Sequence, residues 1–290
     1  MRLALVTAFA AKDLDQDLAP LLVAAQERGW NTQVCCWDDA SVDWSRFDVA
    51  LLRSTWDYAY RLEEFLAWVS AVARQTELQN SAALVLWNTD KRYLLQLADL
   101  GVPIIATRLL APGSPIDVSD RAEFVVKPSV GAGARGVRRF ASGELEAARE
   151  HILMLHRTGK TALVQPYLGR VEREGETALI YFNGVFSHAI RKGPLLPVGA
   201  RSENALFEAE AVIARTPRAQ ELAVGQQVLA AIPAGAPLYA RIDLLSDAAG
   251  RPLLLELEVT EPSLFLATEP GSAQRLLHAL ATRRAKASAS

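Results

Sequence analysis

The first hundred residues alternate between short apolar runs and amphipathic stretches, and this alternation limits the chain to few folds. Apolar runs predict strands at Leu3–Thr7, Thr32–Trp37 and Val49–Ser54. Between them, Ala19–Arg28 and Arg61–Arg74 carry apolar side chains at the spacing of one helix face. Strands that alternate with helices in this way are typical of an open, mostly parallel sheet, so we expect an α/β fold here.

The alternation continues to about residue 105. Leu84–Trp87 is another short apolar run, and Asp90–Leu100 reads as a helix that Gly101 ends. Lys91 would then lie in the first turn of that helix, where a positive charge opposes the helix dipole. A bound anion would remove this conflict, although a solvated lysine is the alternative.

The remainder of the 290-residue chain, long enough for roughly two domains, mixes strands and helices. Asn183-Gly184 between two alternating runs predicts a hairpin of Thr177–Phe182 and Val185–Arg191. Lys192–Ala205 is irregular and contains glycine and proline, which makes it a candidate lid. Helices are predicted at Glu144–Leu155, Pro217–Ile232 and Gln274–Arg283.

A glycine-rich loop follows the apolar run that begins at Phe124. The run ends in Lys127 and Pro128, and the loop after it is made of small residues, with Gly131, Gly133 and Gly136 among them. Glycine lets a backbone turn its N–H groups toward a ligand, and successive N–H groups form a concave surface that binds phosphate. With the lysine as a point charge beside it, this stretch predicts a nucleotide phosphate loop.

The same loop contains a literal G-x-G-x-x-G, the fingerprint of dinucleotide-binding sites. That fingerprint requires a helix directly after the glycines. Val137–Gly143 is instead short and strand-like, and resembles the return arm of a hairpin. A nicotinamide or flavin site is therefore disfavoured, and a hairpin tip without any ligand remains as the other alternative.

A second stretch gathers carboxylates. Tyr239–Leu245 and Pro252–Val259 predict a hairpin whose alternation separates two faces. One face is apolar and contains Ile242, Leu244, Leu253, Leu255, Leu257 and Val259; the other contains Arg241, Asp243, Glu256 and Glu258. The hairpin brings Asp243 near Glu256, and like charges opposite each other destabilise a sheet. A hard divalent cation would relieve the repulsion, whereas a solvated outer face is the alternative.

A third cluster follows the run Val49–Ser54. It places polar and aromatic side chains at the carboxyl end of a strand, where open α/β sheets bind ligands: Arg53, Ser54, Trp56 and Asp57. These residues are candidates for substrate binding. A cluster that only caps and packs the strand end explains them equally well.

The overall composition excludes several classes of partner. The formal net charge of −2 does not favour nucleic acid or an anionic membrane. No apolar run approaches the ~20 residues that span a bilayer. The adjacent Cys35 and Cys36 are unlike a disulfide framework and fit a reducing cytoplasm. The partner expected is a small molecule, with a homo-oligomer allowed. The four histidines show no triad or metal-ligand grouping: His151, His156, His188 and His278.

Together, these stretches resemble the ATP-grasp carboxylate–amine ligases, in which a strand lysine, a small-residue loop, an adenine hinge and a metal hairpin follow in this order. The chain is most similar to the branch of glutathione synthetase and the ribosomal-protein-modifying ligases. Within it, the motifs L-R-S-T-W-D-Y, W-N-T-D-K-R-Y-L and E-L-E-V-T-E-P-S-L resemble the D-cycloserine-forming cyclo-ligases. The resemblance implies a Rossmann-like pre-ATP-grasp domain (1–105), a small lid subdomain (106–168) and a C-terminal subdomain with the metal site (169–285).

The resemblance also implies a role for individual residues in binding ATP. Lys91 and Lys127 match the two lysines that hold the phosphates, and Glu176 matches the acid that binds the ribose. The loop that closes over the phosphates corresponds to Ser129, Gly131, Ala132, Gly133 and Gly136, and the adenine hinge to Gln165, Tyr167 and Leu168.

The catalytic and metal residues are implied in the same way. Arg191 matches an arginine that meets the transferred phosphate, and Arg241 matches a catalytic arginine. Two Mg²⁺ ions are expected on Asp243, Glu256 and Glu258. The last of these ligands is commonly Asn in the family, so the extra charge of Glu258 could admit Mn²⁺.

The implied reaction has two steps. A substrate carboxylate attacks the γ-phosphate of ATP, which gives an acyl phosphate and ADP. An amine, or an N–O nucleophile in the same molecule such as O-ureidoserine, then displaces phosphate and forms a C–N bond. The alternatives are a small-molecule kinase with the same nucleotide site and a non-catalytic ATP-binding module.

Overall fold

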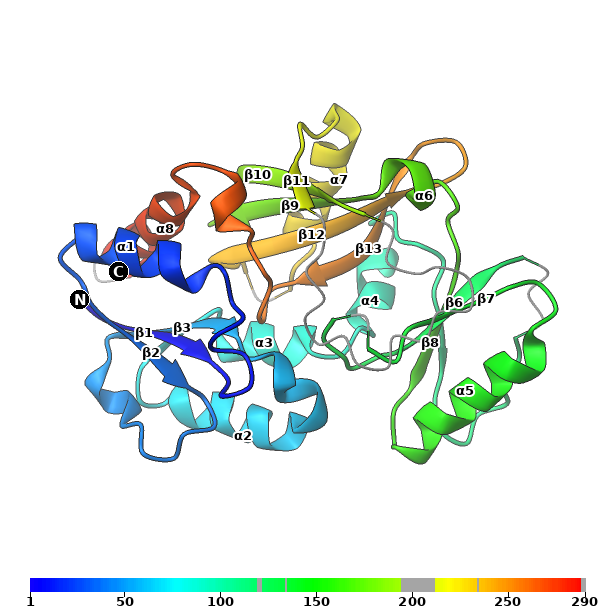
Figure 1. Cartoon of the computed structure of the whole chain (residues 1–290), viewed down its shortest axis with the longest axis horizontal. Helices are drawn as coiled ribbons and strands as arrows, with labels where there is room; N and C mark the ends of the chain where they lie inside the picture. Colours follow the sequence, from blue (N-terminus) through cyan, green and yellow to red (C-terminus); the bar gives the residue numbers. More distant parts are fainter. Residues whose placement is uncertain (119–121, 134, 194–211, 234, 288–290) are drawn as a thin grey trace.

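The computed structural model describes residues 1–118, 122–133, 135–193, 212–233 and 235–287 (Figure 1). Within these ranges the chain forms three sheets with helices packed around them, which confirms the predicted α/β class. Residues 194–205 of the predicted lid lie outside the described residues. No described helix is both long enough and apolar enough to cross a membrane.

The first sheet has the predicted parallel arrangement, with strand order β2-β1-β3-β4. Its strands are β1 (Arg2–Thr7), β2 (Asn31–Cys36), β3 (Val49–Ser54) and β4 (Glu77–Gln79), and its helices are α1 (Leu18–Glu27) and α2 (Leu62–Val72). Strand β4 was not predicted, because three residues carry too little pattern. The apolar run Leu84–Trp87 belongs to helix α3 (Ala82–Asn88) and not to a strand.

Helix α4 begins later than its pattern suggested. It spans Tyr93–Asp99, so Lys91 precedes the helix and does not lie in its first turn. The backbone N–H of Lys91 donates to the carbonyl of Ser129 instead, 2.8 Å away. The predicted conflict with the helix dipole therefore does not arise, and another cause must explain why this lysine is placed here.

The second sheet carries the glycine loop, in the strand order β5-β8-β6-β7. Its strands are antiparallel: β5 (Arg108–Leu110), β6 (Phe124–Pro128), β7 (Arg138–Phe140) and β8 (Ala162–Pro166), with α5 (Leu145–Arg157) packed against them. Strand β7 follows the loop and pairs with β6, so Phe140 lies opposite Phe124. The predicted hairpin is confirmed, and the strand stands where a dinucleotide fingerprint needs a helix.

The third sheet is antiparallel, with the order β11-β10-β9-β12-β13, and in Figure 1 it lies between the other two. Its strands are β9 (Glu176–Phe182), β10 (Val185–Lys192), β11 (Val212–Ala214), β12 (Tyr239–Ser246) and β13 (Pro252–Glu258). The helices of this part are α6 (Val171–Glu174), α7 (Ala219–Ala230) and α8 (Ser272–Ala287).

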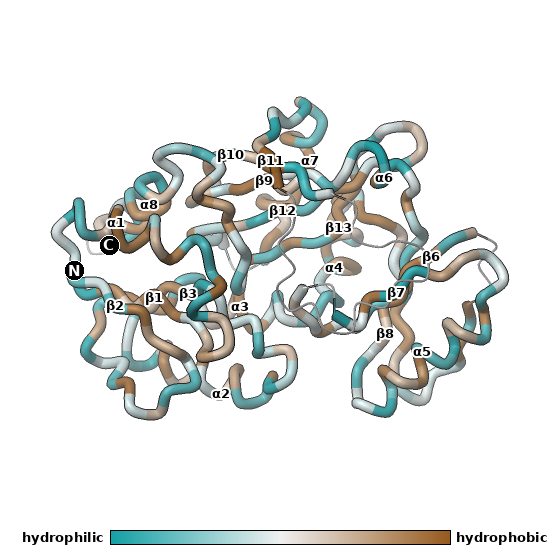
Figure 2. The backbone as a smooth tube through the Cα atoms, viewed as in Figure 1, coloured by the Kyte–Doolittle hydropathy of each residue, from teal (hydrophilic) through white to brown (hydrophobic). Residues whose placement is uncertain are grey.

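One hydrophobic core joins the first sheet to the third. Leu3, Leu5 and Leu51 pack in a single cluster with Ile180 and Leu276, all fully buried. Helices α1 and α8 lie side by side at the left of Figure 1. Figure 2 shows that hydrophobic segments recur along strands of all three sheets. The first and third sheets are thus held together by apolar packing, which fixes the position of any site between them.

The β12–β13 hairpin confirms the predicted charge pairs and corrects the predicted apolar face. The register pairs Arg241 with Glu258 and Asp243 with Glu256. Beyond Asp243 the register shifts, so that Leu244 pairs with Leu254 and Leu255 becomes the extra residue of a β-bulge. Leu254 is fully buried, and the predicted placement of Leu253 and Leu255 on the apolar face was wrong.

Candidate active site

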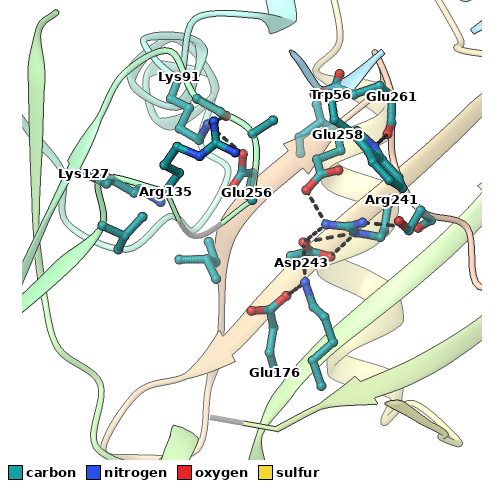
Figure 3. Close-up of a pocket in the computed structure, with 18 of the residues that line it drawn as sticks. Trp56, Lys91, Lys127, Arg135, Glu176, Arg241, Asp243, Glu256, Glu258 and Glu261 are labelled. Carbon is teal, nitrogen blue, oxygen red and sulfur yellow. Dashed lines mark hydrogen bonds and ion pairs between the residues drawn. The ribbon is translucent and has the colours of Figure 1, made fainter. Parts of the chain in front are cut away.

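A pocket of about 600 Å³ lies where the three sheets meet (Figure 3). Its walls come from the loops after β1 and β6, from the end of β8, from β12 and β13, and from the segment after β13. This volume lies in the range typical of small-molecule sites. Most of the predicted site residues line it, although they are scattered over more than two hundred positions of sequence.

Two buried lysines occupy one side of the pocket. Lys91 donates from Nζ to the carbonyl of Gly131 at 2.8 Å and pairs with Glu256 at 3.0 Å. Burial opposes the charge of Lys91, but Glu256 raises the pKa of this lysine overall. The ammonium group of Lys127 makes no hydrogen bond or ion pair with any described residue, and burial lowers its pKa. A buried ammonium group without a direct partner marks a place that an anion would stabilise.

The glycine loop folds over this side of the pocket. Gly131, Ala132 and Gly133 line the pocket, as does Arg135, whose guanidinium lies 4.2 Å from the centre of the Tyr60 ring. Two predicted loop residues face elsewhere. The N–H of Ser129 donates to the Thr161 carbonyl at 2.9 Å, and Gly136 lies with φ +70° against the ring of Pro128.

The predicted adenine hinge also lines the pocket, at the end of β8, the strand that pairs with β6 and its Lys127. Gln165, Tyr167 and Leu168 all border the pocket, and the Gln165 side chain donates to the Thr107 hydroxyl at 2.9 Å. Apolar side chains from both neighbouring sheets also line the pocket, and we call this part the apolar slot: Val125, Val137, Val171, Leu245 and Leu255. The bulge in β13 is what turns Leu255 toward the pocket, so this slot depends on a feature that alternation alone did not predict.

The carboxylate cluster lies at the centre, and a basic side chain faces each predicted metal ligand. Arg241 donates to both oxygens of Asp243, at 2.8 and 2.9 Å, and pairs with Glu258. Lys192 bridges Asp243, 3.0 Å away, and Glu176. Figure 3 shows Asp243 beside Arg241, with Glu176 close by. Asp243 and Glu258 thus belong to one ion-pair network, whereas Glu256 pairs separately with Lys91.

Burial and charge act on these carboxylates in opposite directions. Burial alone would raise the pKa of Asp243, but Arg241 and Lys192 hold it well below its usual value. Burial prevails elsewhere: it raises the pKa of Glu258 to about 7 and that of Glu176 to about 8. Arg241 and Lys192 are therefore not enough to hold the pKa values of Glu258 and Glu176 at their usual level.

The donor chemistry of this network fits a hard divalent cation, because the candidate ligands are all carboxylate oxygens. In the described part of the chain, no three Asp, Glu, His or Cys side chains converge on a preformed metal position. Basic side chains neutralise the carboxylates instead, so a cation would replace Lys91, Lys192 or Arg241 at some of these oxygens.

Arg191 does not border the pocket with the other predicted residues. Its guanidinium donates to the carbonyls of Glu174, at 2.6 Å, and Arg173, at 3.0 Å. Side chains alternate along a strand, so the next residue of β10, Lys192, points into the site. The basic residue that the structure places beside Asp243 is thus one position further along the chain.

Of the four substrate candidates, only Trp56 lines the pocket. Arg53 is fully buried and pairs with Asp17 at 3.0 Å. The hydroxyl groups of Ser54 and Thr7 lie 2.7 Å apart, and Asp57 accepts from Nε1 of Trp37 at 2.9 Å. The side chains of these three residues make contacts within the protein, as expected for a cluster that caps and packs the end of the strand.

Sequence reasoning missed several lining residues: Asp13, Asp15, Asn88, Arg135, Lys192, Glu261 and Ser263. Asp13 and Asp15 follow strand β1 closely, so the rule that parallel sheets bind ligands at the carboxyl ends of strands could have found them. Asn88, Glu261 and Ser263 lie within the motifs of the family resemblance but had no assigned role. Arg135 lies within the glycine loop, and Lys192 is next to the predicted Arg191.

Glu261 gives the free protein a pH-dependent stability. Burial, with Glu258 nearby, raises its pKa from 4.5 to about 8. The folded state then binds the proton more tightly, so the stability from this group is present below pH 4.5 and is lost as the pH rises toward 8. We expect Glu261→Gln to increase the free energy of unfolding at pH 9 by roughly 2–4 kcal/mol, and hardly at all near pH 5.

Urea unfolding at the two pH values, without nucleotide, measures this difference. Glu63→Gln, at an exposed position of α2, is the matched control and should show the same small effect at both. An equal effect of Glu261→Gln at pH 5 and pH 9 would contradict the assignment.

Comparisons with known proteins agree with this geometry. The profile of the D-cycloserine synthetase DcsG N-terminal domain matches residues 3–80. The cycloserine biosynthesis protein DcsG of Streptomyces lavendulae is 40% identical over 296 residues, covering 97% of this chain and 98% of that protein. A crystal structure of D-cycloserine synthetase DcsG superposes with a TM-score of 0.89 at 39% identity, over 98% of this chain and 99% of the other.

A more distant structure shares the fold alone. The D-alanine–D-alanine ligase of Bacillus anthracis, in complex with ATP, has a TM-score of 0.68 at 15% identity over 99% of both chains. The resemblance inferred from the lysine, the glycine loop and the carboxylate hairpin is thus confirmed. The chain belongs to the DcsG family of ATP-grasp enzymes and is an ATP-dependent carboxylate–amine ligase.

Proposed function

We propose that the chain closes an O-ureidoserine-like amino acid into a ring at the expense of ATP. The substrate carboxylate attacks the γ-phosphorus of ATP and ADP leaves, which produces an acyl phosphate. The nitrogen bound to oxygen in the same molecule then attacks the acyl carbon, phosphate leaves, and that nitrogen gives up its proton. Similarity to DcsG proteins over nearly the whole chain supports this substrate class.

The observation that carries the nucleotide site is Lys127, a buried ammonium without a direct protein partner. We place the phosphates of ATP between Lys127, Lys91 and the N–H groups of Gly131–Gly133. The adenine lies in the apolar slot, with its edge toward the backbone at Gln165 and Tyr167. Glu176 binds the ribose. Ser129 and Gly136 support the shape of the loop from behind.

Arg241 is the residue assigned to the transferring phosphoryl group. Its guanidinium donates to Asp243, to Glu258 and to the Ser263 carbonyl, and the last of these contacts uses no carboxylate oxygen that a metal ion would take. We assign the role of the second basic group at the transferred phosphate to Lys192 and not to Arg191, because of these two residues only Lys192 lines the pocket.

We assign Asp243, Glu256 and Glu258 to two Mg²⁺ ions, which would supply charge neutralisation at the phosphates when bound. The third ligand is Glu where the family commonly has Asn. The extra negative charge leads us to expect activity with Mn²⁺ as well.

The free thiols are consistent with a cytoplasmic enzyme. Cys35 and Cys36 are both unpaired and buried. Burial raises the pKa of Cys35 to about 11, which keeps the thiol protonated and unreactive. We therefore propose the reducing cytoplasm as the compartment.

Release of ADP and phosphate with Mg²⁺-ATP tests the proposal, across a panel of amino acids, dipeptides and both enantiomers of O-ureidoserine. We expect release that depends on one enantiomer, with a product lighter than the substrate by one water. The methyl ester of O-ureidoserine is the control, because it lacks the free carboxylate and should not support release. A stable phosphorylated product, or an amide between two molecules, would overturn ring closure.

A further inference from the structure

An irregular segment, Thr260–Leu266, follows β13 and forms one wall of the pocket. Its backbone carbonyls at five successive positions each accept a hydrogen bond from a side chain elsewhere in the chain. The donors, in order from position 260 to 264, are the Tyr239 hydroxyl (2.9 Å), Trp56 Nε1 (2.9 Å), Arg53 Nη2 (3.0 Å), Arg241 Nη1 (3.2 Å) and His188 Nε2 (2.9 Å). Such a run of side-chain donors replaces the strand or helix partners that this segment lacks.

Asp17 satisfies the N–H groups of the same segment. Its Oδ2 accepts from the Leu264 N–H at 2.6 Å, and its Oδ1 accepts from the Leu266 N–H at 2.7 Å. Arg53 Nη2 reaches the same Oδ2 at 3.0 Å. Arg53 is fully buried and Asp17 nearly so, which makes this a buried ion pair whose geometry is fixed on both sides. A buried ion pair often adds little net stability, because removing both charges from water costs free energy. We therefore look for the role of this pair in the segment that it holds in place.

The ordered segment faces the reaction site. Glu261, Ser263 and Phe265 line the pocket, and Phe265 has a left-handed backbone at φ +52°. Arg241 donates to the Ser263 carbonyl and lies 5.7 Å from the centre of the Phe265 ring. The segment is therefore in contact with the arginine that the ligase reaction uses. Of the buried pair, Asp17 borders the pocket and Arg53 does not, so Arg53 can act on the substrate only through the segment.

The segment lies on the side of the pocket away from the nucleotide. Figure 3 shows Trp56, Glu261 and Arg241 on one side, with Lys91 and Lys127 on the other. We propose that Arg53 and Asp17 are positioning residues for the amino acid substrate. They fix the wall from Glu261 to Leu266 and, through Ser263, the orientation of Arg241. The placement of the two substrates rests on the proposed function, but the ordering of the segment does not.

Asp17→Asn is the decisive variant because it preserves size. Asn offers a single acceptor oxygen, so its amide NH₂ must face one of the N–H groups of Leu264 and Leu266, donor against donor. We expect hydrogen exchange in the peptide covering 260–268 to become at least about tenfold faster. Exchange in the peptide covering β8 should remain unchanged. Hydrogen exchange is measured without substrate, so it tests the ordering of the segment even if the proposed function is wrong.

Steady-state kinetics with the amino acid that supports ADP release provide the second readout. We expect the KM for that substrate to rise about tenfold or more, with the dissociation constant for ATP within about twofold of wild type. Arg53→Lys keeps the charge and should lie between wild type and Asp17→Asn in both readouts. It also serves if Asp17→Asn does not fold.

Val69→Ala is the matched destabilised control. It removes buried methyl groups from α2 without touching the segment, so it should lower the melting temperature but alter neither exchange at 260–268 nor the substrate KM. Unchanged exchange at 260–268 in Asp17→Asn, or parallel losses of substrate and ATP affinity, would overturn the inference. If the wild-type protein does not close the ring of O-ureidoserine, only the proposed substrate is wrong, and the ordering of the segment by Asp17 is unaffected.

Discussion

Asp243→Asn will lower ADP-forming turnover by about two to three orders of magnitude while leaving the fold intact. Asp243 accepts from Arg241 and Lys192 and lies opposite Glu256 across the hairpin. Asn removes the charge that holds both cations, and its NH₂ group must face one of them. The loss of one preorganised charge at the reacting phosphate has effects of this size in other enzymes.

Initial rates of ADP release, with circular dichroism and melting curves as the measure of folding, check this result. Asp247→Asn is a matched control on the turn of the same hairpin, where Asp247 pairs with the exposed Arg251 at 2.8 Å. It should leave turnover unchanged. Turnover close to wild type in Asp243→Asn would refute the assignment of the carboxylate cluster.

The sequence was informative where local pattern and local chemistry agree. Strands β1 and β3 follow from apolar runs separated by helical patterns, and the pairing of Asp243 with Glu256 follows from a short hairpin. The bulge could not be predicted, because Leu253, Leu254 and Leu255 are identical and no alternation shows which of them turns inward. A run of one residue type contains no register information.

The remaining errors concern which neighbour faces inward and which partners are distant. Arg191 and Lys192 are adjacent and both basic, so composition cannot decide which one faces the site; the strand's pairing decides it. Arg53 resembled a substrate residue at a strand end, but its partner Asp17 lies 36 positions earlier and the carbonyl of Pro262 lies 209 positions later. Only the folded chain brings these groups together, so the positioning role was invisible beforehand.

Lys127→Met will have opposite effects on stability and on nucleotide binding. Lys127 is buried without a direct partner, and burial lowers its pKa. The folded protein therefore disfavours the charged form of this lysine. Between the lowered pKa and the pKa of the unfolded chain, the unfolded state binds more protons, so the stability of the fold rises with pH. Met fills a similar space without a charge. We expect the melting temperature of the free protein at pH 7 to rise, and its increase with pH below ~10.4, the pKa of an unperturbed lysine, to weaken.

The same variant, and Lys127→Ala, should lower ADP-forming turnover by roughly two orders of magnitude or more, because a charged contact to the phosphates is lost. Titration with ATP and melting curves at several pH values measure the two effects in one sample. Lys12→Met, at an exposed lysine outside the pocket, should change neither. A lower melting temperature together with unchanged ATP affinity would show that Lys127 supports the fold and not the nucleotide. Higher stability with weaker ATP binding is the combination that a buried phosphate site requires, since the group that binds the anion is the one that destabilises the free protein.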